Sequence, residues 1–196
     1  MKRVFDIIFS LTVLLLFLPL GFVISVLILI SSKGGIFYKQ TRIGKNKKPF
    51  SLLKFRSMKI ESDKKGKLTV GMNDKRITKI GGFIRKYKLD EFPQFINVIK
   101  GDMSIVGPRP EVKEYVDLYN EEELKILNVK PGITDYASLE YFRENEVLAQ
   151  SKNPEKTYIE EIMPKKIALN YKYLKNPTLP HDFKIIFKTI LRIIRN

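Results

Sequence analysis

Two adjacent carboxylates, Asp90 and Glu91, are the residues best suited by type and position to do chemistry. The chain has no cysteine and one histidine, so thiol nucleophiles, disulfides and multi-histidine metal sites are excluded. A helix is predicted to begin at 89–92, because apolar residues then recur at helical spacing and Pro93 is tolerated in a first turn. There one ionised carboxylate could be a nucleophile that needs no base, and the other could hold Mg²⁺ with substrate phosphates. Alternatively, the pair only caps the helix.

Three basic residues are candidates for binding phosphate. Arg109 lies in Gly-Pro-Arg-Pro (107–110), where a glycine and two prolines restrict the backbone and hold the guanidinium ready for bidentate contact with phosphate. The alternative is an arginine in an ordinary rigid turn. Lys54 and Arg56 alternate with apolar residues on a predicted strand, so they are either site residues or the solvated face of that strand.

The elements that must position these residues are read from hydrophobic periodicity and turn signals. With 196 residues the chain is long enough for one domain with a core. The pattern predicts a β-hairpin at 36–59, a polar mobile loop at 61–75, helical structure at 77–99, turns and extended chain at 101–110, and helices at 111–128 and 155–175. Asp90, Gln94 and Asn97 share one face of the 77–99 pattern, opposite its apolar residues.

An uncharged apolar segment at 7–30 predicts a membrane element. As a straight helix it would measure roughly 36 Å, enough to cross a hydrocarbon core of about 30 Å. However, Pro19 near its middle bends a helix, and basic residues flank the segment on both sides, which favours the cytoplasmic face for both ends. We therefore expect a re-entrant helix over 1–32, with a single spanning helix as the alternative.

The formal net charge of +15 could attract a partner of opposite charge, such as anionic lipid, nucleic acid or a phosphorylated substrate. No zinc-finger spacing or RNA-recognition signature is found, so no nucleic acid partner is expected. At 182–195 basic residues recur every three or four positions opposite an apolar face, which predicts an amphipathic helix lying in a membrane interface. The alternative is a helix docked on the domain core with its basic edge in water.

Residues 88–110 (KLDEFPQFINVIKGDMSIVGPRP) resemble the core of the bacterial sugar transferases, the monotopic polyprenol-phosphate phosphoglycosyl transferases. Further motifs of that family occur in the family's order along the chain, at 40–44, 54–58 and 73–86 before this segment and at 129–134 after it. The resemblance implies transfer of a sugar 1-phosphate from a UDP-sugar to undecaprenyl phosphate, with release of UMP. This is the first membrane step of a surface glycan, such as an O-antigen, capsule, exopolysaccharide or glycoprotein glycan.

The resemblance also implies a role for each candidate residue. Asp90 would be the nucleophile that forms a covalent phosphosugar intermediate, and Glu91 the catalytic ligand of a Mg²⁺ cofactor. Arg109 would bind phosphate, supported by Lys54 and Arg85. Membrane lipid and downstream glycosyltransferases are further expected partners, at the cytoplasmic face of the bacterial inner membrane. The family's re-entrant helix bends at a Ser-Pro pair, whereas this chain has Leu-Pro at 18–19.

The predicted fold is α+β and mainly helical. It comprises the re-entrant helix (1–32) and a cytoplasmic catalytic domain (33–196) with a small β-hairpin and interfacial amphipathic helices around a membrane-surface active site. Residues 135–148 depart from the family pattern, which suggests a different sugar or nucleotide pocket, and Arg143 and Glu146 either belong to it or are exposed charges. Two other functions remain open: a non-catalytic basic protein that binds anionic lipid or nucleic acid, and an anchored transferase with soluble substrates.

Overall fold

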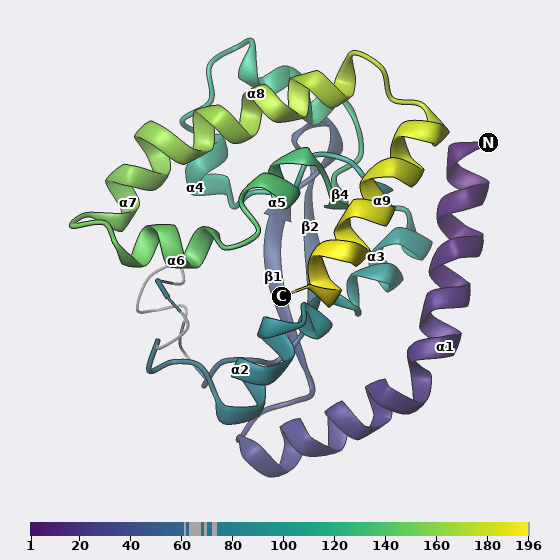
Figure 1. Ribbon diagram of the computed structural model, residues 1–196, viewed down its shortest axis with the longest axis vertical. Coiled ribbons are helices and arrows are strands. Elements are labelled where there is room, and N and C mark those ends of the chain that lie inside the picture. The colour runs from purple at the N-terminus through teal and green to yellow at the C-terminus, as the bar shows by residue number, and fades with distance from the viewer. Residues whose placement is uncertain (61, 63–67, 69, 72–73, 196) are drawn as a thin grey trace.

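The computed structural model describes residues 1–60, 62, 68, 70–71 and 74–195, and it is mainly helical with two small sheets (Figure 1). Most of the loop predicted at 61–75 lies outside the described residues. In the first half of the chain the elements are α1 (Lys2–Ser31), β1 (Phe37–Ile43), the 3₁₀ turn η1 (Lys45–Lys47), β2 (Pro49–Phe55), α2 (Lys79–Lys86), the 3₁₀ turn η3 (Leu89–Glu91), α3 (Gln94–Lys100) and β3 (Ser104–Val106). They are followed by α4 (Lys113–Val116), the 3₁₀ turn η4 (Glu123–Asn128), β4 (Gly132–Thr134), α5 (Tyr136–Glu140), α6 (Glu144–Ala149), α7 (Pro154–Thr157), the π-helical η5 (Tyr158–Ile162), α8 (Met163–Leu174) and α9 (Leu179–Ile194).

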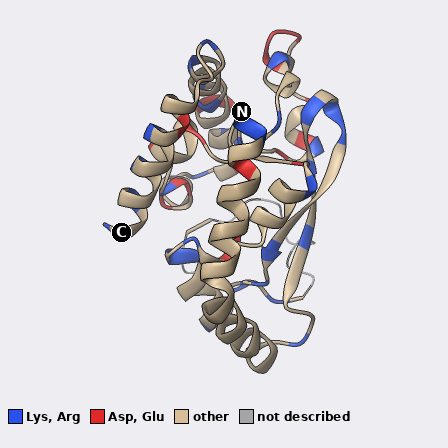
Figure 2. Cartoon of the chain, turned by 90° about the vertical axis from the view of Figure 1, so that its right-hand side faces the viewer, with Lys and Arg blue, Asp and Glu red and all other residues tan. Residues whose placement is uncertain are grey.

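Helix α1 is one helix that bends sharply near its middle, and Pro19 lies inside it (Figure 1). A proline removes a backbone hydrogen bond and clashes with the preceding turn, which explains such a bend. The first half packs against α3 and β3, and the second half reaches α2. All its charged residues lie near the N-terminus (Figure 2), and by length and composition it could cross a membrane.

Polar contacts fasten the N-terminal end of α1 to the rest of the molecule. Lys2 forms an ion pair with the fully buried Asp182 of α9. Arg3 donates to two carbonyls in the last turns of α3, those of Val98 at 2.6 Å and Ile99 at 2.9 Å. One further contact comes from Asp6, whose carboxylate accepts from the Ser104 hydroxyl at 2.8 Å.

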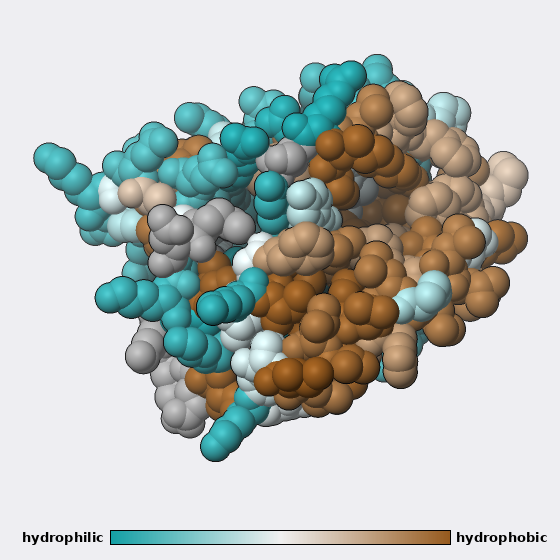
Figure 3. Space-filling model, turned by 60° about the horizontal axis from the view of Figure 1, so that its bottom comes forward, coloured by the Kyte–Doolittle hydropathy of each residue, from teal (hydrophilic) through white to brown (hydrophobic). Residues whose placement is uncertain are grey.

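The other side of α1 is apolar and exposed. Leu16, Leu18 and Phe22 are 75%, 64% and 69% exposed, although each is a large hydrophobic side chain. On the face shown in Figure 3, hydrophobic residues gather on one side, where the lower half of α1 lies, and hydrophilic residues cover much of the other side. Monomeric soluble proteins rarely expose contiguous apolar surface of this kind, so this face is suited to contact with lipid.

The predicted hairpin is confirmed. Strands β1 and β2 pair antiparallel from Phe37 opposite Phe55 to Ile43 opposite Pro49. Asn97 of α3 joins β2 to the interior, because its side-chain oxygen accepts from the Leu53 amide at 2.9 Å and its NH₂ group donates to the Ser51 carbonyl at 2.8 Å. The polar face predicted for 77–99 is therefore buried against the hairpin, not exposed to water.

Two predicted helices are broken in the structure. The pattern at 77–99 is divided into α2, η3 and α3, because Lys88 adopts a left-handed conformation with φ of 56° and Pro93 begins a new helix. The pattern at 111–128 is divided into α4 and η4. There Asn120 and Glu123 exchange side chain–backbone hydrogen bonds of 2.9 Å in a capping box, which starts a separate turn. By contrast, 155–175 is nearly continuous through α7, η5 and α8.

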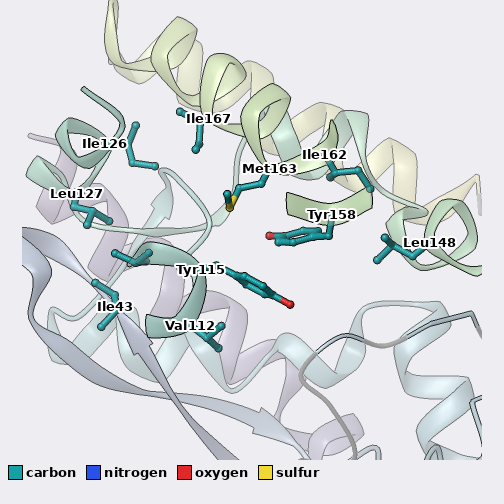
Figure 4. Packing of buried hydrophobic residues seen from close by; sticks show 11 residues of the cluster. Ile43, Val112, Tyr115, Ile126, Leu127, Leu148, Tyr158, Ile162, Met163 and Ile167 are labelled. Atoms are coloured by element: carbon teal, nitrogen blue, oxygen red, sulfur yellow. The ribbon is translucent and has the colours of Figure 1, made fainter. Parts of the chain in front are cut away.

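The hydrophobic core is divided into three clusters of buried side chains. The first lies between α4, η4 and the η5–α8 helix, where Tyr115 and Tyr158 pack with ring centroids 4.8 Å apart (Figure 4). The second includes β3 and α9, and the third joins α1 to α2 and β2. Helix α9 begins at Leu179, three residues before the predicted 182, and buries Ile185 and Ile186 in the second cluster. It is thus docked on the core, while Phe187 and other apolar residues on another side stay exposed.

Candidate active site

The carboxylate pair lies in the short 3₁₀ turn η3, one residue before Phe92 and two before Pro93 begins α3. The left-handed backbone of Lys88 changes the direction of the chain after α2, and the turn η3 that follows is buried at Asp90. As a result Asp90 is only 5% exposed and the Glu91 side chain 11%. Two adjacent buried carboxylates repel each other, so cations must lie close by.

Glu91 is held by two cations from different parts of the chain. Lys54 Nζ of β2 lies 3.2 Å from Glu91 Oε1. Arg109 binds the same carboxylate in a bidentate manner, with Nη1 3.1 Å from Oε2 and Nη2 bonded to Oε1. Burial alone would raise the pKa of Glu91, but Arg109 and Lys54 outweigh burial and hold that pKa well below its usual value. Glu91 is therefore ionised.

Asp90 is in the opposite condition. Burial raises the pKa of its carboxyl group, Lys54 opposes that effect, and the neighbouring charge of Glu91 adds to it. The Asp90 side chain makes no hydrogen bond or ion pair with any described residue. A buried carboxylate whose oxygens are not already bonded is available to attack an electrophile, provided that nearby cations keep it ionised.

Arg109 is fixed through its backbone as well as its side chain. It follows β3, which pairs parallel with β4. The two strands run so close that a Cβ atom on Gly132 would lie 2.1 Å from the amide nitrogen of Gly107, so only glycine fits there. The Arg109 amide donates to the Asp135 carboxylate at 3.0 Å, and the same carboxylate caps α5 by accepting from the Ser138 amide at 2.6 Å. Glu91 raises the pKa of Arg109, which stays charged.

The structure brings the five predicted site residues into one region. Burial lowers the pKa of Lys54, and Glu91 opposes that shift. Arg85 of α2 donates to the Ser57 hydroxyl at 3.4 Å, and its charge also lowers the pKa of Asp90. Arg56 is different, because its guanidinium is exposed and donates to the carbonyls of the chain before and within β1. Of the two strand cations, only Lys54 belongs to the site.

An apolar cavity of about 350 Å³ opens beside the charged residues. Its walls come from α1, α3, α5 and α9, with Phe9, Phe95 and Ile190 among the lining side chains. Glu91 and Arg109 also line it, so a charged end and an apolar space are continuous. This combination suits a ligand that carries an anionic group on a hydrocarbon chain.

The donor set fits Mg²⁺ without forming an all-protein cage. Among the described residues no group of three or more Asp, Glu or His side chains could enclose a metal ion. Mg²⁺ is usually held by one or two carboxylates together with substrate phosphates, and Asp90 and Glu91 supply that number. Glu91 would share its carboxylate between the ion and the two cations that contact it.

Sequence reasoning missed a second polar cluster beside Arg109 and the role of Asp135. The cluster consists of Arg42, Glu111, Glu144, Tyr158 and Lys166, which come from five separate segments. Spacing along the chain gives no signal for such a cluster, whereas Asp135 three residues before Ser138 has the pattern of a helix cap. Arg143 and Glu146 lie outside the cluster: both are largely exposed, with their charged groups 3.8 Å apart.

Comparison with known proteins identifies the family of this chain. The family model described as "Bacterial sugar transferase" matches residues 1–196. The UDP-glucose:undecaprenyl-phosphate glucose-1-phosphate transferase of Escherichia coli is 37% identical over 98% of this chain and 40% of its own length. A UDP-N-acetylgalactosamine-undecaprenyl-phosphate N-acetylgalactosaminephosphotransferase of Aeromonas hydrophila is 37% identical over 98% of this chain and 43% of its own length.

A shorter relative is covered more fully. The exopolysaccharide production protein ExoY of Rhizobium meliloti is 34% identical over 96% of this chain and 83% of its own length. The chain thus spans less than half of the first two relatives and most of the third. A family-model match that spans residues 1–196 shows that the chain belongs to the bacterial sugar transferase family.

Proposed function

We propose that this protein transfers a sugar 1-phosphate from a UDP-sugar to undecaprenyl phosphate and releases UMP, as an early membrane step of surface glycan synthesis. The observation that carries the proposal is that the charged residues around Asp90 and the apolar cavity adjoin each other. A buried, unbonded carboxylate with Lys54 and Arg109 nearby is suited to a diphosphate, and the adjoining apolar cavity is suited to a polyprenol chain. Relatives named for these substrates support the assignment.

In the proposed first step, an oxygen of Asp90 attacks the phosphorus that bears the sugar. A new Asp90–phosphorus bond forms, the bond from that phosphorus to the UMP oxygen breaks, and UMP leaves with the electron pair. Attack of an anion on a diphosphate is opposed by repulsion, which Arg109 and Lys54 reduce by placing positive charge beside the phosphoryl oxygens. Mg²⁺ held by Glu91 would add a Lewis acid that neutralises charge on the diphosphate.

In the second step, a phosphate oxygen of undecaprenyl phosphate attacks the phosphorus bound to Asp90. The Asp90–phosphorus bond breaks, which restores the carboxylate and leaves the sugar on a lipid diphosphate. The acceptor's chain would lie in the apolar cavity formed by α1, α3, α5 and α9, with its phosphate at the end lined by Glu91 and Arg109. Both substrates therefore meet at one buried carboxylate.

A re-entrant α1 in the inner membrane is part of the proposal. Both ends of the helix contact the same domain: Lys2 and Arg3 do so through polar contacts, and Ile24 and Ile28 pack with Ile84 of α2. A spanning helix would carry one end about 30 Å away across the hydrocarbon core. The contacts support a helix that enters and leaves the cytoplasmic leaflet, with the domain on the cytoplasmic face.

The test is a single-turnover experiment without lipid acceptor. The wild-type protein given a UDP-sugar and Mg²⁺ is expected to release up to one UMP per site and to gain the mass of one sugar phosphate. Asp90→Asn is expected to lose both signals, whereas the exposed control Asp117→Asn keeps both. UMP release only when undecaprenyl phosphate is present, with no adduct, would favour direct transfer and contradict the nucleophilic role. No release with any UDP-sugar would leave the lipid-binding alternative.

A further inference from the structure

A second, polar cavity lies on the other side of Arg109. It has a volume of about 140 Å³, and Arg109, Glu144 and Lys166 line both it and the apolar cavity. This volume is several times the space that one buried water requires. A group larger than a few waters can therefore occupy it, directly beside the guanidinium to which the proposed function assigns the phosphate.

The walls of this polar cavity carry a dense hydrogen-bond network. Lys166 Nζ lies 3.0 Å from Glu144 Oε2, 3.2 Å from the Tyr158 hydroxyl and 3.5 Å from Glu111 Oε1. Tyr158 donates to Glu111, and Arg42 donates to the other oxygen of Glu111 at 3.4 Å. All four charged side chains are at most 23% exposed.

The charges in this network balance. Arg42 and Lys166 oppose Glu111 and Glu144, and the pKa values of Glu111 and Lys166 are shifted in the directions that keep both ionised. A phosphate needs an excess of positive charge, which this network lacks, because its two cations are already paired with its two carboxylates. Balanced donors and acceptors around a small cavity suit a neutral group with many hydroxyls.

One lining side chain has spare hydrogen-bonding capacity. Asn145 lines the cavity and is half-buried, and its side chain has no hydrogen-bond partner within the described part of the chain. It lies next to Glu144 at the start of α6, in the 135–148 segment. An amide can donate and accept at once, as recognition of a hydroxyl or an acetamido group requires.

We propose that this polar cavity binds the sugar ring of the donor, and that Glu144 and Asn145 determine which sugar is accepted. The inference rests on the proposed function and adds a location and a selectivity to it. A sugar in the polar cavity would have its phosphate at Arg109, between the ring on one side and the apolar cavity on the other.

The test measures donor selectivity in the full-length protein. UMP release is measured with UDP-glucose, UDP-galactose, UDP-N-acetylglucosamine and UDP-N-acetylgalactosamine, in the presence of undecaprenyl phosphate and Mg²⁺. Glu144→Gln and Asn145→Ala are compared with Glu146→Gln, whose side chain lies on the same helix but is 51% exposed. The first two are expected to change the ratio of kcat/KM between donors by about tenfold or more. Inhibition by free UMP, which has no sugar, is expected to stay unchanged in all three.

Each other result has a definite meaning. If the ratio between donors is unchanged in Glu144→Gln and Asn145→Ala, the network is structural and the inference is wrong. Weaker inhibition by UMP, in proportion to the loss with donors, would place the nucleotide in the cavity and overturn it equally. Should Glu144→Gln lower the melting temperature, Asn145→Ala decides, since the Asn145 side chain gives up no hydrogen bond to the described residues. A wild-type protein that releases no UMP with any donor would instead contradict the proposed function itself.

Discussion

At the scale of single residues, two neighbouring carboxylates differ in the cations they contact and in the direction of their pKa shifts. Glu91 contacts Lys54 and Arg109 and has a lowered pKa, whereas Asp90 is buried without a hydrogen bond to the described residues and has a raised pKa. Pairs of titratable groups whose pKa values are shifted apart often have different catalytic roles. The difference supports Asp90 as nucleophile and Glu91 as the charged ligand.

Replacement of Arg109 by lysine tests the bidentate contact. Lysine keeps the positive charge but has a single ammonium group, so it cannot contact both oxygens of a carboxylate or phosphate in a fixed fork. We expect Arg109→Lys to lower kcat/KM for UMP release by about 10²- to 10³-fold. The melting temperature should change little. A variant with near-normal turnover would assign Arg109 to the turn and not to the substrate.

The pH dependence of the first half-reaction tests the state of Asp90. Only the ionised carboxylate is nucleophilic, and its pKa is raised above the ordinary aspartate value of about 3.9. The rate of the UMP burst should therefore fall as pH decreases through that raised pKa, at a higher pH than for an ordinary aspartate. Arg85→Met removes a cation that lowers this pKa. In this variant the fall of the burst rate at low pH, the acid limb of the pH–rate profile, should therefore move to still higher pH. An unmoved limb would show that another group controls it.

These residue-scale findings were only partly predictable. Asp90, Glu91 and Arg109 were selected because neighbours in the sequence restrict their backbone or supply a helix start. The cluster of Glu111, Tyr158 and Lys166 could not be found in this way, because its members meet only when distant segments fold together.

At the scale of elements, the position of Arg109 depends on a close approach of two short strands. β3 and β4 pair through Ser104 with Gly132 and Val106 with Thr134, and the turn that carries Arg109 follows directly. The sequence predicted extended chain at 101–110, but its partner strand is distant and was not predicted. Strand pairing is non-local, so periodicity within one segment does not reveal it.

Gly132→Ala should disturb this approach. The added methyl group would lie 2.1 Å from the Gly107 nitrogen, and backbone cannot move aside as a flexible side chain can. We expect a loss of about 3 kcal/mol or more in the free energy of unfolding, seen as a lower melting temperature in the same detergent. Gly35→Ala is the control, because its Cβ meets no atom within 4 Å. Equal melting temperatures for the two variants would contradict the close approach.

Helix boundaries were harder to predict than helix existence. Apolar spacing continues through 77–99, yet a left-handed residue and a proline break the segment into three pieces. In the C-terminal helix α9 the apolar side is broader than the part that packs against the core. Ile185 and Ile186 face the core, while Phe187 and Ile194 remain exposed. The sequence pattern alone could not divide that side between core and surface.

At the scale of the whole molecule, the exposed apolar face and the +15 charge agree with a protein held at an anionic membrane surface. The expected small sheet and mainly helical fold are present, and the long apolar N-terminal helix is one bent element. Re-entry into one leaflet stays a prediction, because it depends on a bilayer as well as on the chain.

Cysteine labelling tests this topology without background, since the chain has no native cysteine. A cysteine-bearing tag placed before Met1 and a Lys33→Cys variant should both react with a membrane-impermeant maleimide only after the cytoplasmic side is opened. Lys113→Cys, whose side chain is 70% exposed on α4, is the control for that side. Labelling of the tag from outside intact cells would demonstrate a spanning helix.

The contact of Arg3 with the carbonyls of Val98 and Ile99 affects when the candidate active site is fully assembled. α3 follows directly from the turn η3, and Arg3 of α1 supplies donors to carbonyls in the last turns of α3. A newly made chain whose α1 has not yet packed against α3 lacks these two hydrogen bonds, so the turn η3 is incompletely held until α1 is in place. Under the proposed function, nucleotide sugar would then be consumed only by molecules in which α1 has packed against α3.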